Sequence, residues 1–174
     1  MSWACADLCD DHGDEVSVVE LPLRRMGRVG EICGPAATIS TREDNTLVRA
    51  ALETAGEDRV LVVDGGGSMR CALVGDTLVS LAIEGGWAGI VVNGAIRDSG
   101  LIATMDLGVW ALGTNPRRSE KADQGRRDVP VRLGATVIHP GDWVYVDVDG
   151  MIVAPRRLHE PPASERSPLG FRRV

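Results

Sequence analysis

Short apolar runs alternate with amphipathic segments through the middle of the chain. Mostly apolar runs at 59–63 and 88–92, with a shorter run at 72–74, have the length and composition of buried strands. Apolar positions three and four residues apart predict helices over 46–55 and 77–84. Because strands and helices alternate at this spacing, we expect parallel strands joined by crossover helices.

The flanking segments extend this pattern at both ends. We expect a short helix over 2–11, a turn and strand over 14–19, and a glycine-rich strand over 28–41. Between this region of alternating strands and helices and the last third of the chain, we expect a helical turn from Arg97 to Met105 and a strand at 109–112. A polar surface loop is predicted over 115–127. Short strands separated by turns such as Asp149-Gly150 are predicted at 129–131, 135–138, 143–148 and 151–153.

The length suits one domain. The chain has 174 residues, within the usual size of a single compact domain. We expect that domain over residues 1–155, and a flexible tail rich in arginine and proline over 156–174. With 21 glycines and few aromatic residues, the predicted class is α/β, with a central, partly parallel sheet and glycine-rich loops.

Charge and composition exclude several classes of protein. A net charge of −6 gives no general attraction to nucleic acid or to an anionic membrane, so we expect neither as a direct partner. Neither a membrane-spanning run nor a signal peptide is recognisable, which predicts a cytoplasmic protein. The four cysteines and three histidines lack metal-ligand spacing, so we expect reduced thiols and structural histidines.

Two short motifs carry candidate chemistry. Asp76 is expected to cap the helix over 77–84, which would leave the backbone N–H groups of Thr77 and Leu78 to bind an anion; simple capping is the alternative. After the strand at 88–92, Arg97 offers a planar guanidinium to a carboxylate, and Asp98 is an oxygen ligand suited to Mg²⁺ or Mn²⁺. The alternative for this pair is a solvated helix start.

A glycine loop at 64–68 follows another predicted strand. The Asp-Gly-Gly-Gly-Ser sequence does not match the G-x-G-x-x-G pattern of a dinucleotide loop, and nothing else indicates an S-adenosylmethionine site. We therefore expect a tight turn that lines the same cleft as Arg97 and Asp98, beyond the carboxyl ends of the strands.

Residues 59–113, followed by Asn-Pro-Arg-Arg-Ser at 115–119, resemble the RraA-like family. This family includes the regulator of ribonuclease E activity A and the 4-hydroxy-4-methyl-2-oxoglutarate aldolases, and the similarity runs from about residue 6 to residue 155. The resemblance implies an α/β/β layered fold of the swivelling-domain type. It also implies assembly as a homotrimer or hexamer.

The resemblance also assigns roles to the two motifs. The aldolases of the family carry an Asp, twenty intervening residues and then Arg-Asp, as Asp76 and Arg97-Asp98 do here. It implies that Asp98 is the protein ligand of a divalent metal and that Arg97 contacts substrate. The backbone of Gly75, Asp76, Thr77 and Leu78 would hold the substrate carboxylate, and Asp76 would orient a catalytic water.

The family pattern is not matched throughout. Some aldolases have an acidic residue where this chain has Leu101, and some use a C-terminal Glu of the neighbouring subunit, for which Glu160 or Glu165 is a candidate.

Together the motifs imply a metal-dependent (class II) aldolase that cleaves 4-hydroxy-4-methyl-2-oxoglutarate-type 2-oxo acids to pyruvate, with oxaloacetate decarboxylase side activity. The alternative is a non-catalytic regulator that binds and inhibits ribonuclease E. The presence of both Asp76 and Asp98 favours the enzyme, since regulators of the family are expected to lack them.

Overall fold

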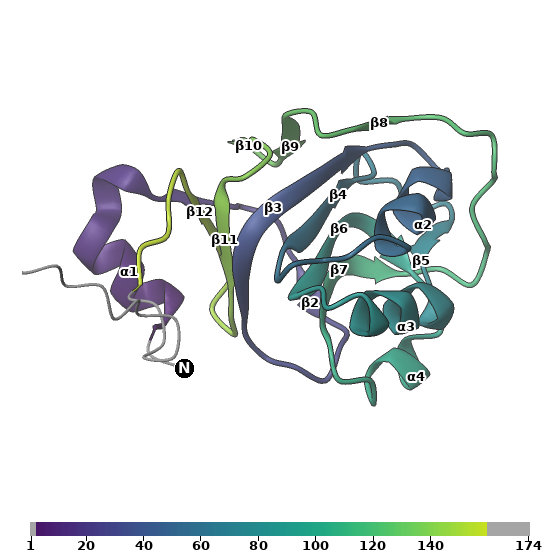
Figure 1. The fold of residues 1–174 in the computed structure, drawn as a ribbon, viewed down its shortest axis with the longest axis horizontal. Coiled ribbons are helices and arrows are strands. Elements are labelled where there is room, and N and C mark those ends of the chain that lie inside the picture. Colours follow the sequence, from purple (N-terminus) through teal and green to yellow (C-terminus); the bar gives the residue numbers. More distant parts are fainter. Residues whose placement is uncertain (1–2, 160–174) are drawn as a thin grey trace, which may run out of the picture.

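A computed structural model describes residues 3–159 and places a ten-stranded mixed sheet at the centre of the protein (Figure 1). Its strand order is β1-β12-β11-β3-β4-β6-β7-β2, with β5 added beside β6 and β8 beside β3. The parallel strands are β3 (Ile32–Ser40), β4 (Val60–Asp64), β5 (Ala72–Val74), β6 (Gly89–Ile96) and β7 (Gly108–Thr114).

Three helices cover one face of the parallel strands. They are α2 (Thr46–Leu52), α3 (Asp76–Glu84) and α4 (Ser99–Ile102) (Figure 1). Side chains alternate along each strand, so Leu61 and Val63 of β4 pack with these helices, while Val60 and Val62 face the other way. The continuous apolar runs of the sequence are therefore explained by burial on both faces.

The opposite face is covered by more β structure. The hairpin of β9 (Val131–Leu133) and β10 (Thr136–Ile138) packs there together with residues of β11 (Trp143–Val146) and β12 (Met151–Ala154). Short antiparallel strands complete the sheet: β1 (Ser17–Val18), β2 (Arg24–Arg25) and β8 (Arg126–Arg127). The protein thus has three layers, which are the helices, the large sheet and a second layer of β structure. This confirms the predicted α/β class and the partly parallel sheet.

The N-terminal helix packs at the far end of the molecule. α1 (Cys5–His12) and the short 3-10 helix η1 (Gly13–Glu15) precede β1, and Cys5 and Leu8 are buried against Tyr145 and Ile152. All four cysteines are free, as predicted. Burial raises the pKa of the Cys5 thiol, as expected for a structural cysteine.

Residues 156–159, at the start of the predicted tail, contact the N-terminal part of the chain and β11. Arg156 donates to Glu15 in an exposed ion pair, and the Leu158 N–H donates to the Tyr145 hydroxyl over 2.7 Å. His159 also contacts that hydroxyl. The rest of the predicted tail, with Glu160 and Glu165, lies outside the described residues.

One strand boundary was placed wrongly. β6 continues to Ile96, beyond the predicted end at residue 92, so Asn93 and Gly94 lie within the strand. Apolar residues that follow Gly94 extend the buried strand, and all eight residues of β6 are buried. No helix within residues 3–159 is long and apolar enough to cross a membrane.

Candidate functional site

Two neighbouring parallel strands bring the two predicted motifs together. β5 pairs with β6 so that Val74 lies opposite Ile96, and both strands end at the same edge of the sheet. The Arg97 N–H donates to the Val74 carbonyl over 2.9 Å. The residues that follow these strands, Gly75 and Arg97, are therefore side by side although 22 positions separate them in the sequence.

Gly75 permits a close approach of the Arg97-Asp98 pair. A Cβ atom built on Gly75 would lie 2.8 Å from Asp98 Oδ2 and 3.3 Å from Arg97 Nε. Arg97 Nε in turn lies 3.2 Å from Asp98 Oδ2, and each side chain is about 40% exposed. Both charged groups thus lie close to the backbone at the start of α3 and remain accessible to a ligand.

Asp98 has an unusual backbone conformation. It precedes α4 with φ 55° and ψ 31°, in the left-handed region that non-glycine residues seldom occupy. Asp tolerates this conformation better than most residues do. The Leu101 and Ile102 N–H groups donate to the Asp98 carbonyl, which fixes the turn and directs the carboxylate back toward Gly75.

The prediction that Asp76 caps α3 is wrong. Gly75 occupies the N-cap position, Asp76 is the first helical residue, and no side chain caps this helix. The helix therefore begins one residue earlier than predicted, and the Leu78 N–H donates to the Gly75 carbonyl. The amides left without an intrahelical acceptor are those of Asp76 and Thr77, and the Asp76 carboxylate is not used for capping.

A pocket of about 170 Å³ opens at this edge of the sheet. It is lined by Asn45, Arg49, Ala72, Val74, Gly75, Asp76, Thr77, Leu78, Arg97, Arg118, Ser119 and Lys121. The structure thus brings all the predicted site residues into one neighbourhood, with Asp98 against Gly75. Asp76 is the one acidic side chain among the described lining residues, and four of them are basic.

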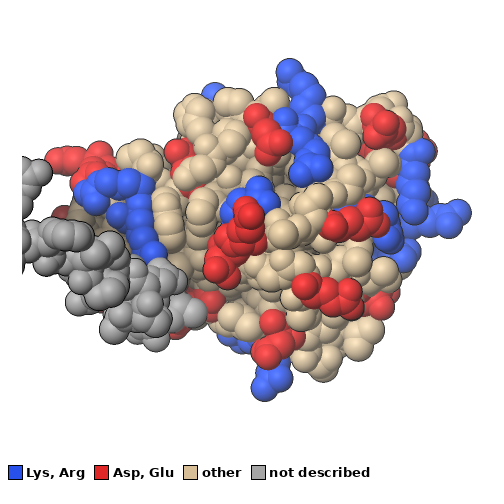
Figure 2. All heavy atoms as spheres, viewed as in Figure 1, with Lys and Arg blue, Asp and Glu red and all other residues tan. Residues whose placement is uncertain are grey.

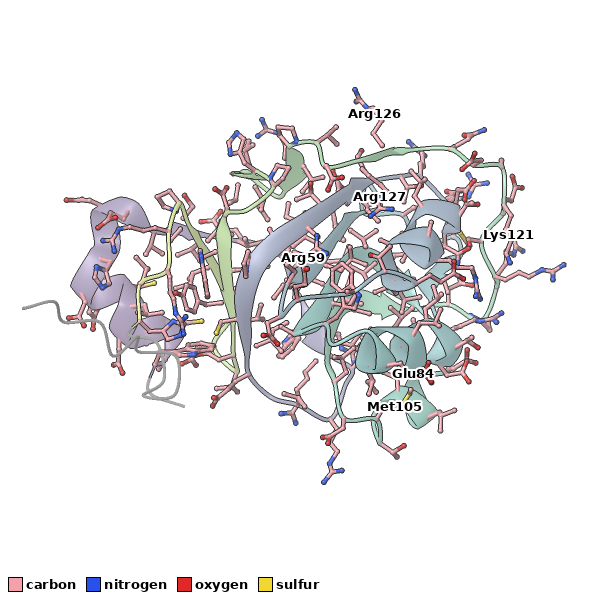
Figure 3. The ribbon with its side chains drawn as sticks, viewed as in Figure 1. Arg59, Glu84, Met105, Lys121, Arg126 and Arg127 are labelled. Atoms are coloured by element: carbon pink, nitrogen blue, oxygen red, sulfur yellow. The ribbon has the colours of Figure 1, made fainter. Side chains whose placement is uncertain are left out.

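Sequence reasoning missed the loop that closes the pocket. The sequence predicts only a polar surface loop over 115–127, but Arg118, Ser119 and Lys121 line the pocket and Ser119 is buried. Figure 3 shows Lys121 on this loop where it passes beyond α2 and β5. A run of basic residues after β7 was the available signal, but its position depends on long-range contacts.

Asp44 fixes this loop. Its carboxylate is buried, with Oδ1 accepting the Thr46 N–H over 2.8 Å and Oδ2 accepting the N–H groups of Ala122 and Gln124. Burial raises the pKa of Asp44, but these hydrogen bonds outweigh it and lower the pKa to about 2. The sequence could not indicate this role of Asp44, because bonds to residues some 80 positions away leave no local pattern.

The glycine loop does not line this pocket, contrary to expectation. Asp64 Oδ1 accepts the Gly66 N–H and the side-chain amide of Asn93, each over 2.9 Å, which makes the loop a tight turn. Asp64 and Gly66 line a separate pocket of about 410 Å³ with residues of β3 and of the loop before β8. The extension of β6 through Asn93 places the turn away from Arg97.

Asp98 is a carboxylate suited to a divalent metal at this site. No group of three His, Cys, Asp or Glu side chains within residues 3–159 could hold an ion. Mg²⁺ commonly keeps several waters and binds through one or two carboxylates plus substrate oxygens. Half-exposed Asp98, with the space that Gly75 leaves by having no Cβ atom, fits such a water-rich site.

The comparisons with known proteins identify the family. The RraA-like model, described as Aldolase/RraA, matches residues 5–153. The chain therefore belongs to the RraA-like family, as the sequence resemblance predicted.

Two curated relatives are similar over nearly their whole length. The protein of Burkholderia multivorans is 51% identical over 163 residues, covering 91% of this chain and 99% of the relative. The protein of Burkholderia mallei is 52% identical over 165 residues, covering 92% of this chain and 100% of the relative. Both names assign these relatives provisionally as 4-hydroxy-4-methyl-2-oxoglutarate aldolases.

Solved structures share the fold but carry different names. A protein of Geobacillus kaustophilus, titled S-adenosylmethionine:2-dimethylmenaquinone methyltransferase, superimposes with a TM-score of 0.88 at 48% identity, covering 90% of this chain and 97% of that one. The RNA-processing inhibitor RraA from Thermus thermophilus gives a TM-score of 0.86 at 38% identity, covering 96% of this chain and 99% of that one. The fold is therefore shared by proteins named for different activities.

Proposed function

We propose that the protein is a divalent-metal-dependent aldolase that cleaves 4-hydroxy-4-methyl-2-oxoglutarate-type 2-oxo acids to pyruvate. The observation that carries the proposal is the convergence of Arg97 and Asp98 on Gly75, beside a pocket lined by Asp76. The provisional names of the Burkholderia relatives agree with it.

The start of α3 and Arg97 would hold the pyruvyl end of the substrate. The free amides of Asp76 and Thr77, at the positive end of the helix dipole, suit the C1 carboxylate. The guanidinium of Arg97 would then lie beside the C2 keto oxygen, where negative charge develops as the C3–C4 bond breaks. Because Arg97 is held by Asp98 over 3.2 Å, it is oriented before substrate arrives.

Cleavage needs a base for the C4 hydroxyl. The C3–C4 electron pair remains on the pyruvyl fragment, the C4 hydroxyl becomes a carbonyl, and its proton must be accepted. Asp76 lines the pocket and is not used for capping, so its carboxylate can hold a water that takes this proton. The same water can later return a proton to C3.

Asp98 is the residue that would hold the Mg²⁺ or Mn²⁺ ion. A divalent cation bound there would supply Lewis-acid stabilisation of the charge on the keto oxygen. Since decarboxylation of oxaloacetate develops the same charge on a pyruvyl fragment, we expect oxaloacetate decarboxylase side activity at this site.

The experiment is a pyruvate-release assay with 4-hydroxy-4-methyl-2-oxoglutarate and with oxaloacetate. We expect turnover with Mg²⁺ or Mn²⁺, its loss in EDTA, and its loss in Asp98→Ala but not in Asp106→Asn, a control on the exposed turn after α4. Turnover that neither EDTA nor Asp98→Ala reduces would refute the proposed mechanism.

A second candidate function follows from the Thermus thermophilus neighbour, whose title describes an RNA-processing inhibitor. On that reading the protein binds ribonuclease E and inhibits it without chemistry. Inhibition of ribonuclease E by a protein that releases no pyruvate from either substrate would favour this alternative. We expect a homotrimer or hexamer in either case, which light scattering tests.

A further inference from the structure

We infer that Arg118 is a specificity-determining residue that binds the second carboxylate of a dicarboxylic 2-oxo acid. The inference rests on the proposed function, because it assumes that the pyruvyl end of the ligand lies at Arg97. It gives a role to the wall of the pocket that carries Arg118, which the proposed chemistry does not use.

The charge of the pocket exceeds what a single carboxylate needs. The whole chain carries a net charge of −6, yet Arg49, Arg97, Arg118 and Lys121 line this one pocket against Asp76 alone among the described residues. Figure 2 shows Lys and Arg side chains gathered at the edge of the molecule where the 115–125 loop runs, on the right of the view. A pocket with this excess of positive charge favours a ligand with more than one negative group.

Of the three arginines that line this pocket, Arg118 is the one whose side chain has no partner among the described residues. Arg97 contacts Asp98, and Arg49 lies 3.5 Å from Glu53. Within residues 3–159 the Arg118 guanidinium makes no hydrogen bond or ion pair, so it can donate two parallel N–H groups to a ligand carboxylate. The buried Ser119 beside it adds a hydroxyl to the same wall.

The backbone of Arg118 is held in place. The Ala72 N–H donates to the Arg117 carbonyl over 2.8 Å, and Ala72 bridges to Arg118. The Glu120 N–H donates to the Glu43 carbonyl over 3.0 Å, and Asp44 binds the residues that follow. A fixed backbone reduces the entropy lost when the side chain is ordered by a ligand.

The position of Arg118 along β5 suits the length of a diacid. Arg118 lies beside Ala72, near the start of β5, whereas Gly75 and Arg97 lie beyond its end. Three residues of strand correspond to roughly 10 Å. A five-carbon dicarboxylate together with an extended arginine side chain spans this separation, whereas pyruvate has no second carboxylate to offer Arg118.

Equilibrium binding tests the inference without turnover. The probes are 2-oxoglutarate, which has the pyruvyl group and a second carboxylate but no C4 hydroxyl to cleave, and pyruvate, which lacks the second carboxylate. Isothermal titration calorimetry with Mg²⁺ present gives the ratio of the two dissociation constants. We expect 2-oxoglutarate to bind more tightly by on the order of tenfold to a hundredfold, as for one charge-assisted carboxylate contact.

The matched variants are Arg118→Gln and Arg117→Gln. Both remove one positive charge from the same loop, but Arg117 does not line the pocket. We expect Arg118→Gln to bring the ratio close to one and Arg117→Gln to preserve it. The inference is overturned by a wild-type ratio near one, or by an Arg118→Gln variant that keeps the wild-type ratio.

The outcome is separable from that of the proposed function. Pyruvate release by a protein that does not prefer 2-oxoglutarate would remove the role of Arg118 and leave the aldolase intact. A preference lost in Arg118→Gln, in a protein without turnover, would leave a dicarboxylate-binding site and remove the aldolase.

Discussion

The backbone of Gly75 lies against the carboxylate of Asp98, so closely that a Cβ atom at residue 75 would be 2.8 Å from Asp98 Oδ2. The glycine is not needed for its backbone conformation, because its φ of −135° is open to any residue. Its missing side chain is what permits the approach of the Arg97-Asp98 pair.

We therefore predict that Gly75→Ala displaces the Asp98 carboxylate and impairs turnover. A displacement of about 1 Å at a reacting group can cost on the order of a hundredfold in rate. Pyruvate-release kinetics measure the effect, and circular dichroism checks that the fold is kept. Gly100→Ala is the control, since a Cβ atom there meets nothing within 4 Å; equal kinetics for the two variants would contradict the steric argument.

Asp76 can be tested separately from the helix that it begins. Because it is not the N-cap residue, Asp76→Ala should not incur the loss of about 1 kcal/mol that removal of a capping side chain causes. We expect kcat to fall on the order of a hundredfold or more, as for loss of general-base assistance, with a smaller change in KM. Glu84→Ala, at the other end of α3, is the control (Figure 3). A large drop in melting temperature without a change in kcat would assign Asp76 a structural role.

The pairing of the two motifs could be predicted because it follows from local rules. The apolar runs that became β4, β5 and β6 indicated buried parallel strands, and the carboxyl ends of such strands meet at one edge. The same rule accounts for the proximity of Gly75 and Arg97, but it wrongly predicts that the glycine loop at 64–68 lines their pocket. The position of Asp76 at the carboxyl edge does not show whether its side chain caps the helix or binds a ligand. That distinction depends on whether the helix begins at residue 76 or at residue 77.

The remainder of the pocket could not be predicted, because it depends on tertiary contacts. Nothing near Asp44 in the sequence indicates that it binds the N–H groups of Ala122 and Gln124. Without those bonds, the segment that carries Arg118 is indistinguishable from any polar loop. The contacts of residues 156–159 could not be predicted for the same reason, since their partners are Glu15 and Tyr145.

Tyr145→Phe tests how that C-terminal segment is held. The change removes the hydroxyl that accepts the Leu158 N–H and contacts His159, while the buried ring stays. We expect a loss of about 1 kcal/mol in the free energy of unfolding, typical of one hydrogen bond. Trypsin should also cleave faster after Arg156 and Arg157, as followed by mass spectrometry.

The control for the segment is Glu15→Gln. It removes an exposed ion pair with Arg156 and should change cleavage little, because exposed pairs contribute weakly. Should Glu15→Gln accelerate cleavage more than Tyr145→Phe does, the ion pair and not the tyrosine hydroxyl would be the main attachment.

Asp44→Asn tests the anchor of the loop that carries Arg118. An amide keeps one acceptor oxygen but places an NH₂ group where a carboxylate oxygen accepts an N–H, so either the Thr46 bond or the two loop bonds are lost. We expect the free energy of unfolding, measured in urea at neutral pH, to fall by about 1–3 kcal/mol. Asp106→Asn, on an exposed turn, is the control.

The pH dependence gives the same test a second readout. The folded protein lowers the pKa of Asp44 from 3.8 to about 2, so its stabilising contribution is fully present above pH 4 and is lost as the pH falls toward 2. The difference in unfolding free energy between wild type and Asp44→Asn should therefore shrink across this range, while Asp106→Asn follows wild type. A constant difference between wild type and Asp44→Asn down to the acid limit would mean that the ionised carboxylate is not what holds the loop.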